Sequence, residues 1–225
     1  MAYEHDDAGF PLLSLNIGKV RSDVYKGKEA RSGIRKTGVD RALRLTELGL
    51  AGDEQADLVN HGGPDKAVCV YSLDHYPHWE DVLKRALPNG AFGENFSVRG
   101  MLEDEVRIGD VFRVGTATVQ ISQPRQPCWK LAMRWGLNEL PLLVTESGAT
   151  GFYFRVLLAG QVKAGDVLRL ERPHAAGITV AEANRVMHRD KGDAAGIRRL
   201  LALGELAANW RETFAKRLAR LENGD

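Results

Sequence analysis

Hydrophobic and polar positions alternate over short stretches in the first half of the chain. The clearest runs are "LLSLNIGKV" (12–20), "KAVCVYSL" (66–73) and "TATVQIS" (116–122). Gly and Asp separate such runs at "GLAGDEQ", "NHGGPDK" and "NGAFGEN", and these clusters are typical of turns. The pattern predicts that residues 13 to about 125 form mainly strands and turns.

Two distant segments repeat one pattern. "VRIGDVFRV" (106–114) and "VKAGDVLRL" (162–170) match at Val, Gly, Asp, Val and Arg, and in each a Gly-Asp pair precedes an alternating strand. Such a repeat indicates one all-β unit that sequence-distant strands close. We therefore expect a mainly β fold, either a barrel or a sandwich.

Helical periodicity appears first after the strand at 66–73. A helix is expected from Asp74, its N-cap, to Leu87, and one face of it holds Tyr76, Trp79, Val82 and Leu83. The segments "CWKLAMRWG" and "NELPLLVTES" also have a helical pattern, and we expect them to pack on the barrel. Cys128 then lies where a strand gives way to a helix.

The composition changes after "ERPHAAG" (171–177). Thr179 with Glu182 three residues later forms a capping box, and "DAAGIRRLLAL" and "LAANWRETFAKRLARL" follow with helical period. Three short helices without a strand predict a small bundle. We expect two domains, a β domain over 1–174 and a three-helix domain over 175–225.

Composition narrows the class of protein. The 225 residues include 31 Lys or Arg and 30 Asp or Glu, a balance that argues against a general nucleic-acid or membrane binder. The sequence shows no secretory signal pattern and no apolar run of about 18 residues. Two cysteines are too few for a disulfide framework, so we expect a soluble, cytoplasmic protein. Nucleotide-binding and serine-hydrolase motifs are absent.

Cys128, in "ISQPRQPCWKL" (121–131), is the first candidate for chemistry. Arg125 and Lys130 flank it, and nearby cations lower the pKa of a thiol and favour the reactive thiolate. Pro124 and Pro127 restrict the backbone at the end of the preceding strand. The alternative is a buried structural cysteine in a loop.

Two loops hold further candidates. In "NHGGPDKAV" (60–68), His61 and Lys66 could donate to an anion; the alternative is a turn with solvated polar side chains. In "AFGENFS" (91–97), Glu94 and Asn95 could accept and donate at a strand start; the alternative is an Asx-type turn.

Other chemistry-bearing residues have simpler interpretations. Cys69 lies in an apolar run and reads as core packing. His75 and His78 have no evident third metal ligand, and we expect them to lie on a solvent-exposed face of the helix. The C-terminal helices are rich in arginine, but their net charge of +2 over 174–225 favours a packing or oligomerisation module over a DNA reader.

Four motifs together resemble a known family, the molybdenum cofactor sulfurase C-terminal (MOSC) domain, in its stand-alone bacterial YiiM-type form. They occur in the order "LTELGLAGDEQADLVNHGGPDKAV", "GAFGENFS", "VRIGDVFRVG" and "ISQPRQPCWKL". The trailing helices resemble the 3-alpha domain of that subfamily. The resemblance implies a closed β-barrel that binds molybdopterin carrying molybdenum, with Cys128 as the metal ligand. The surroundings of that cysteine in the family are matched by Ser122, Arg125 and Lys130, which would bind the cofactor. Three residues in the other matching motifs would shape the cofactor pocket: His61, Lys66 and Asn95.

The resemblance also implies an activity, the reduction of N-hydroxylated compounds such as base analogues, in detoxification. Electrons would come from a separate flavin or iron–sulfur protein, because this chain has no flavin, haem or iron–sulfur motif. His61 or Glu94 could supply the proton. Two alternatives stay open: a persulfide carrier that uses Cys128, and a partner- or DNA-binding module in the C-terminal helices. A homodimer is also left open.

Overall fold

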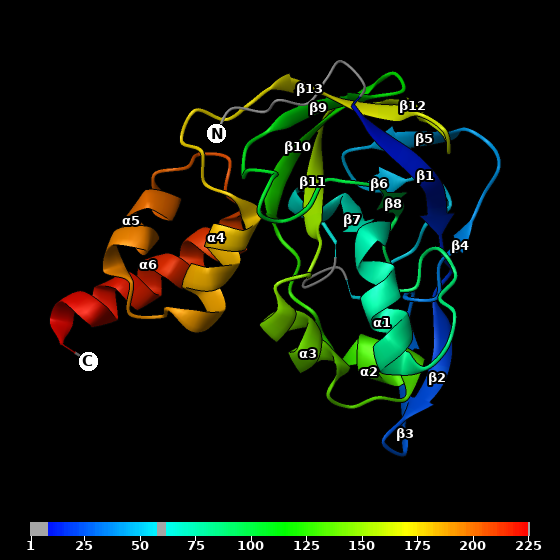
Figure 1. The fold of residues 1–225 in the computed structure, drawn as a ribbon, viewed down its shortest axis with the longest axis horizontal. Coiled ribbons are helices and arrows are strands. Elements are labelled where there is room, and N and C mark those ends of the chain that lie inside the picture. Colours follow the sequence, from blue (N-terminus) through cyan, green and yellow to red (C-terminus); the bar gives the residue numbers. More distant parts are fainter. Residues whose placement is uncertain (1–8, 58–61, 225) are drawn as a thin grey trace.

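A computed structural model describes residues 9–57 and 62–224 of the chain, and its centre is a closed β-barrel (Figure 1). Within these residues seven strands pair in the order β13-β9-β10-β11-β7-β8-β1, and β1 returns to β13 at Phe10 and Leu168. The barrel strands are β1 Phe10–Ile17, β7 Val68–Ser72, β8 Phe96–Val98, β9 Val111–Val114, β10 Ala117–Pro124, β11 Phe152–Leu158 and β13 Val167–Arg172. The prediction of a mainly β fold closed by sequence-distant strands is confirmed.

The repeated pattern forms neighbouring parts of the barrel. β9 and β13 pair antiparallel, with Phe112 opposite Leu170. The two Gly-Asp turns are built alike, because the Asp110 carboxylate accepts from the Arg107 amide at 3.0 Å and the Asp166 carboxylate from the Lys163 amide at 2.8 Å. The repeated sequence pattern therefore corresponds to one turn-and-strand unit that occurs twice in the barrel.

Short strands lie around the barrel. β4 Thr37–Gly38 pairs with β1, and β12 Gly160–Val162, β5 Leu43–Thr46 and β6 Gly49–Leu50 form a small sheet. β2 Arg21–Tyr25 and β3 Lys28–Ser32 form a separate hairpin. Its two-residue turn, Lys26-Gly27, has φ of 50° and 74°, the left-handed conformations that suit a tight hairpin. The hairpin extends from the barrel beside α2 (Figure 1).

Three short helices cover one end of the barrel: α1 Tyr76–Leu83, α2 Trp129–Trp135 and α3 Leu140–Ser147. α2 and α3 pack on the barrel, as expected from the sequence, and they do so at its end. The helices surround a second apolar core that includes Tyr71 of β7, Trp79, Phe92, Leu131 and Val144. The loop that carries Phe92 supplies the centre of this core, so the helices hold that loop in place.

The helix expected over Asp74–Leu87 is shorter than predicted. A 3-10 turn, η2 Leu73–His75, precedes it, and Ser72 rather than Asp74 is the capping side chain. Lys84 takes a left-handed conformation with φ of 52° and ends α1. Tyr76 and Trp79 are buried as predicted, so the face was right and the boundaries were wrong.

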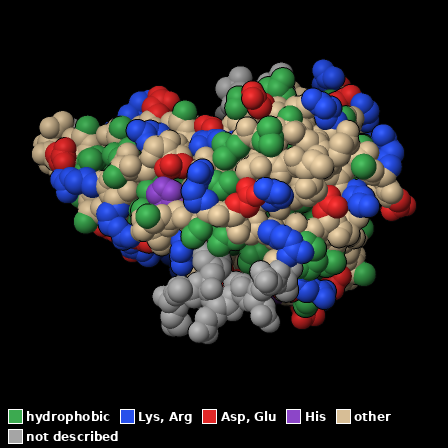
Figure 2. Space-filling view, turned by 90° about the horizontal axis from the view of Figure 1, so that it is seen from above, with side chains coloured by type: hydrophobic (Ala, Val, Ile, Leu, Met, Phe, Trp, Pro, Cys, Tyr) green, Lys and Arg blue, Asp and Glu red, His purple; other side chains and the backbone are tan. Residues whose placement is uncertain are grey.

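The C-terminal segment forms a helical lobe at one side of the barrel, on the left of Figures 1 and 2. It contains α4 Val180–Asn184, continued by the π-helical turn Arg185–Arg189, then α5 Ala194–Leu201 and α6 Ala208–Asn223. The Thr179 hydroxyl accepts from the Glu182 amide at 3.0 Å, so the Thr179 half of the predicted capping box is confirmed. The Glu182 carboxylate pairs with Arg199. Where the barrel domain ends and the bundle begins stays a prediction.

The barrel and the C-terminal helices share one apolar core. Phe112 and Phe154 inside the barrel belong to the same buried cluster as Trp210 and Phe214 of α6. Ile178 and Val180 lie between the two groups, and the Val180 amide donates to Val106 at 3.0 Å. Among the described residues, no helix is long and apolar enough to cross a bilayer.

Candidate functional site

A cavity opens where β10 gives way to α2, at the helix-covered end of the barrel. The space between its walls is about 540 Å³ with open solvent included, and about 50 Å³ of it can hold the centre of a water molecule. Its walls come from several places in the chain: the end of β3 and the segment after it, the segment after β6 with Gln55, the 3-10 turn η1 Pro64–Lys66, β7, the loop before β8, the β10–α2 junction and β11. The lining includes Lys36, Lys66, Cys69, Phe92, Asn95, Arg125, Cys128, Lys130 and Tyr153.

Cys128 is the N-cap residue of α2, with extended backbone (φ −131°, ψ 171°). Its side chain is partly exposed and lines the cavity. Pro124 ends β10 opposite Phe152, and the next amide, that of Arg125, donates to Gly151 at 2.9 Å. β9 pairs with β10 only as far as Gln120, so the missing N–H of Pro124 interrupts no ladder there. This anchoring supports the predicted role of the proline in fixing the junction.

Arg125 is a deeply buried cation of the cavity, with 6% of its surface exposed. Its Nη2 donates to the Phe92 carbonyl at 2.6 Å. Its Nη1 is buried and has no hydrogen-bond partner among the described residues. An unsatisfied buried donor is costly, and an acceptor oxygen that reached Nη1 would remove this cost.

Three lysines complete a cationic lining. Lys36 is 4% exposed and pairs with Asp53, whose carboxylate also accepts from Asn95 Nδ2 at 2.9 Å. Lys130 of α2 is 7% exposed. Burial lowers the pKa of Lys66, although nearby carboxylates oppose the shift. Among the described residues that line the cavity, none carries a carboxylate, so the cavity is electrostatically suited to an anion.

Three residues of the wall with reactive or charged side chains were not expected as site residues: Cys69, Tyr153 and Lys36. Cys69 of β7 is buried, as predicted, but its thiol lines the cavity, and burial raises its pKa to about 11. Tyr153 pairs with it in register across β11 and β7, and burial also raises the pKa of its hydroxyl. Strand pairing brings them together, and no local pattern in the sequence encodes that pairing. Lys36 was missed for the same reason.

Two predicted site residues lie outside the lining. Glu94 is fully buried and accepts from the Tyr76 hydroxyl and three other donors. The Ser122 hydroxyl lies 2.6 Å from the Asp65 carbonyl and 3.1 Å from that of Tyr153. Both residues brace backbone next to the cavity, which favours a structural role. His61 lies outside the described residues.

The two histidines expected on a solvated helix face, His75 and His78, lie in different environments. His78 is exposed as expected, but His75 is partly buried and its Nε2 lies 2.8 Å from the Glu103 carboxylate. That buried partner comes from a distant loop, which explains why the helix pattern gave the wrong environment for His75. No group of three or more His, Cys, Asp or Glu among the described residues could hold a metal ion.

The arginines of the C-terminal helices are largely tied to their own lobe. Arg185 pairs with Asp193, Arg198 with Glu222, and Arg199 with Glu182, while Arg217 donates to carbonyls of the π-helical turn. On the face seen in Figure 2, basic and acidic side chains of this lobe are interspersed. This arrangement agrees with the packing role predicted for these helices.

A closed barrel with a thiol among buried cations at a strand-to-helix junction matches the class that the motifs indicated. The chain belongs to the MOSC domain family, whose model matches residues 57–169. A second model, the YiiM-like, 3-alpha helix domain, matches residues 178–221.

Individual relatives extend this result over most of the chain. Bacillus subtilis YflK is 50% identical over 94% of this chain and 96% of its own length. The crystal structure of YiiM from Geobacillus stearothermophilus superposes with a TM-score of 0.80 at 36% identity, covering 93% of this chain and 99% of that one. A Gibberella moniliformis protein named "Reductase" is 34% identical over 72% of this chain but only 30% of its own length.

Proposed function

We propose that this protein is a molybdenum-cofactor-dependent reductase of N-hydroxylated compounds. One observation carries the proposal: the partly exposed Cys128 thiol shares a cavity with Lys36, Lys66, Arg125 and Lys130. Family membership and the relative named as a reductase support the class of reaction. The substrate class and the metal belong to the proposal alone.

The residues present fit the cofactor. A thiolate is a soft ligand that suits a metal of this kind, and Cys128 is held at a fixed junction by the backbone bonds around it. The cofactor carries a phosphate and an oxo-metal unit, both anionic, and Arg or Lys donors bind such groups by charge-assisted hydrogen bonds. The unpartnered Nη1 of Arg125 is the donor that such an oxygen would satisfy.

The overall reaction consumes two electrons and two protons for each N–OH bond, and it releases the amine and water. The bound cofactor would supply the two-electron redox chemistry. The chain itself must bind and orient the anionic group, limit water and provide a proton. Phe92 and Tyr153 form part of the wall that limits water.

Lys66 is the residue best placed to hold the proton. Lys66 is one of the residues that line the cavity, and burial lowers its pKa, which brings a lysine closer to the range useful for proton transfer at neutral pH. Glu94, the alternative expected from sequence, directs its oxygens to four donors of its own neighbourhood. We therefore assign the proton to Lys66 Nζ.

The test compares Cys128→Ala with Cys69→Ala, since both thiols line one cavity. After expression in a host that makes the cofactor, molybdenum is measured by elemental analysis, and the pterin by its fluorescent oxidation product. We expect wild type and Cys69→Ala to hold both and to reduce an N-hydroxylated purine with viologen as reductant, whereas Cys128→Ala loses metal and activity but keeps its circular dichroism. Full activity in Cys128→Ala would refute the ligand role.

A persulfide carrier is the second candidate, favoured by the partial exposure of Cys128, since sulfur transfer needs an accessible thiol. Mass spectrometry of freshly purified protein separates the two. One added sulfur atom on the Cys128 peptide, with no molybdenum in the same sample, would favour the carrier.

A further inference from the structure

The strongest charge asymmetry in the chain lies in and around the β2–β3 hairpin. Residues 18–36 contain seven Lys or Arg and two Asp or Glu, a net of +5 in a protein whose total is +1. The rest of the sequence is therefore net −4. A segment of this kind produces a local positive field, although the whole protein is nearly neutral.

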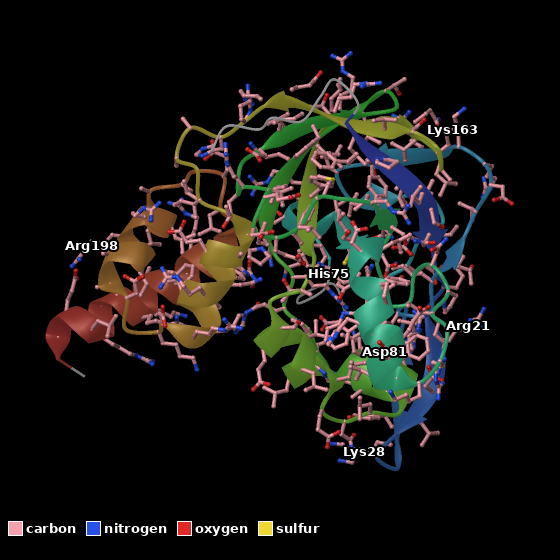
Figure 3. All side chains as sticks on the ribbon, viewed as in Figure 1. Arg21, Lys28, His75, Asp81, Lys163 and Arg198 are labelled. Carbon is pink, nitrogen blue, oxygen red and sulfur yellow. The ribbon has the colours of Figure 1, made fainter. Side chains whose placement is uncertain are left out.

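Four of these cations are exposed and make no ion pair with the described residues: Arg21, Lys26, Lys28 and Arg31. Arg21 and Lys28, labelled in Figure 3, stand at the two ends of the hairpin. Neither β2 nor β3 pairs with any other described strand. Val24, between the charges, is 77% exposed. The hairpin thus combines positive charges that have no ion-pair partner with an exposed apolar side chain. We interpret this combination as a surface that contacts another molecule.

An aromatic contact links this hairpin to the cavity. Tyr25 of β2 stacks on Trp129, with ring centroids 5.5 Å apart and planes inclined by 21°. Trp129 is 42% exposed and directly follows Cys128 in the chain. At its other end the hairpin enters the cavity wall, because Ser32 and Lys36 line the cavity. A protein bound at the hairpin would therefore lie beside the residue next to the reactive thiol.

We propose that the β2–β3 hairpin and Trp129 form the docking face for an acidic redox protein that delivers the electrons of the reaction. The inference rests on the proposed reductase function. It identifies the partner by chemistry: a protein whose flavin or iron–sulfur centre lies behind a carboxylate-rich surface. A flavin hydroquinone that docks here gives up two electrons and two protons and leaves as the oxidised flavin, which balances the reduction of one N–OH bond. An iron–sulfur protein gives one electron at each encounter, so two encounters are needed and the two protons come from water.

Charge complementarity favours a protein partner of this kind. Transient redox complexes bury little surface, so one hairpin with a neighbouring tryptophan is large enough. Attraction between opposite surfaces accelerates such encounters and is screened by salt. The face should therefore act mainly on the rate at which the donor associates, and high salt should remove its effect.

The experiment uses the full-length cofactor-loaded protein and two reductants. The test variant is Arg21→Glu/Lys28→Glu/Arg31→Glu. The control, Arg41→Glu/Lys163→Glu/Arg220→Glu, reverses three exposed cations elsewhere; Lys163 lies at the opposite end of the barrel from Lys28 (Figure 3). Reduction of an N-hydroxylated purine is followed with reduced methyl viologen and with two acidic proteins, reduced flavodoxin and a reduced [2Fe–2S] ferredoxin.

With at least one protein donor, we expect the test variant to lose about tenfold or more in kcat/KM at low ionic strength. It should keep the viologen-driven rate of wild type, and the control should keep both rates. Added salt should slow the protein-driven reaction of wild type and leave that of the variant nearly unchanged. Equal protein-driven rates in variant and wild type would overturn the docking face, as would failure of both donors while viologen works.

A separate outcome would refute the proposed reductase function. If viologen gives no turnover in wild type, the reductase assignment fails, and calorimetric titration of flavodoxin into the three proteins then tests the surface alone. Binding by wild type and control but not by the test variant supports an acidic partner. Absence of flavodoxin binding to wild type would overturn the proposed docking face. Displacement of bound flavodoxin by a single-stranded oligonucleotide would also overturn it and would identify the face as a nucleic-acid-binding surface.

Discussion

Replacing Glu94 by Gln should destabilise the protein strongly, because this buried carboxylate organises the loop that forms one wall of the cavity. Oε1 accepts from the Tyr76 hydroxyl at 2.6 Å and from the Gly90 amide and the Ser97 hydroxyl, each at 2.8 Å. Oε2 accepts from the Phe92 amide at 2.9 Å. Glutamine keeps one acceptor oxygen and presents an NH₂ group to the other donor.

The cost has two parts. The Phe92 amide is left buried without an acceptor, which costs about 1–3 kcal/mol. The remaining three bonds lose their ionic partner, and charge-assisted bonds are roughly twice as strong as neutral ones. Together these give a loss of about 2–4 kcal/mol in the free energy of unfolding, or about 4–16 °C in Tm for a chain of this size.

Thermal and urea unfolding of Glu94→Gln measure this loss, with Glu139→Gln as the matched control. Glu139 is exposed, so its variant should stay within about 0.5 kcal/mol of wild type. Viologen-driven turnover is measured on the same samples at a temperature where both are folded. An unchanged Tm together with lost turnover would refute the structural role and restore Glu94 as a proton donor.

Three further outcomes are expected. The wild-type reductase rate should fall as pH rises through the lowered pKa of Lys66, because the protonated Nζ is the proton donor. The Lys66→Arg variant stays charged, so its pH–rate profile should lack that alkaline fall. A profile identical to that of wild type would exclude Lys66 as the donor. Iodoacetamide at mildly alkaline pH should label the partly exposed Cys128 and spare buried Cys69, whose pKa is raised to about 11. Peptide mass spectrometry measures the labelled fraction of each cysteine. Equal labelling of the two would contradict the burial of Cys69. Thr179→Ala should lower the free energy of unfolding by about 1 kcal/mol, measured by calorimetry, because the bond to the Glu182 amide is lost. An unchanged stability would show that the cap contributes nothing.

The sequence was most informative where structure depends on neighbours in the chain. The strand runs, the cap at Thr179 and the buried face of Tyr76 and Trp79 were all predicted, because alternation and capping are local patterns. The boundaries of α1 were not. The cap at Ser72 and the left-handed Lys84 depend on conformations that several residue types can adopt.

The candidate site divides in the same way. Cys128 and its flanking cations Arg125 and Lys130 are contiguous in sequence, and they line one cavity in the structure. Cys69 and Lys36 reach that cavity only because strands from distant parts of the chain pair around the barrel. Glu94 shows the opposite case: a carboxylate that looks available in sequence is enclosed by donors that only the fold supplies.

The shared core of barrel and C-terminal helices has a consequence for how the protein comes apart. Trp210 and Phe214 lie in the same buried cluster as Phe112, and the Ala208 amide donates to Asp65, the neighbour of Lys66, at 3.0 Å. Helices joined in this way cannot melt independently, so calorimetry should record one cooperative transition. A truncated barrel would expose that apolar surface and aggregate, and the C-terminal lobe is thus part of the folding unit that keeps the cavity intact.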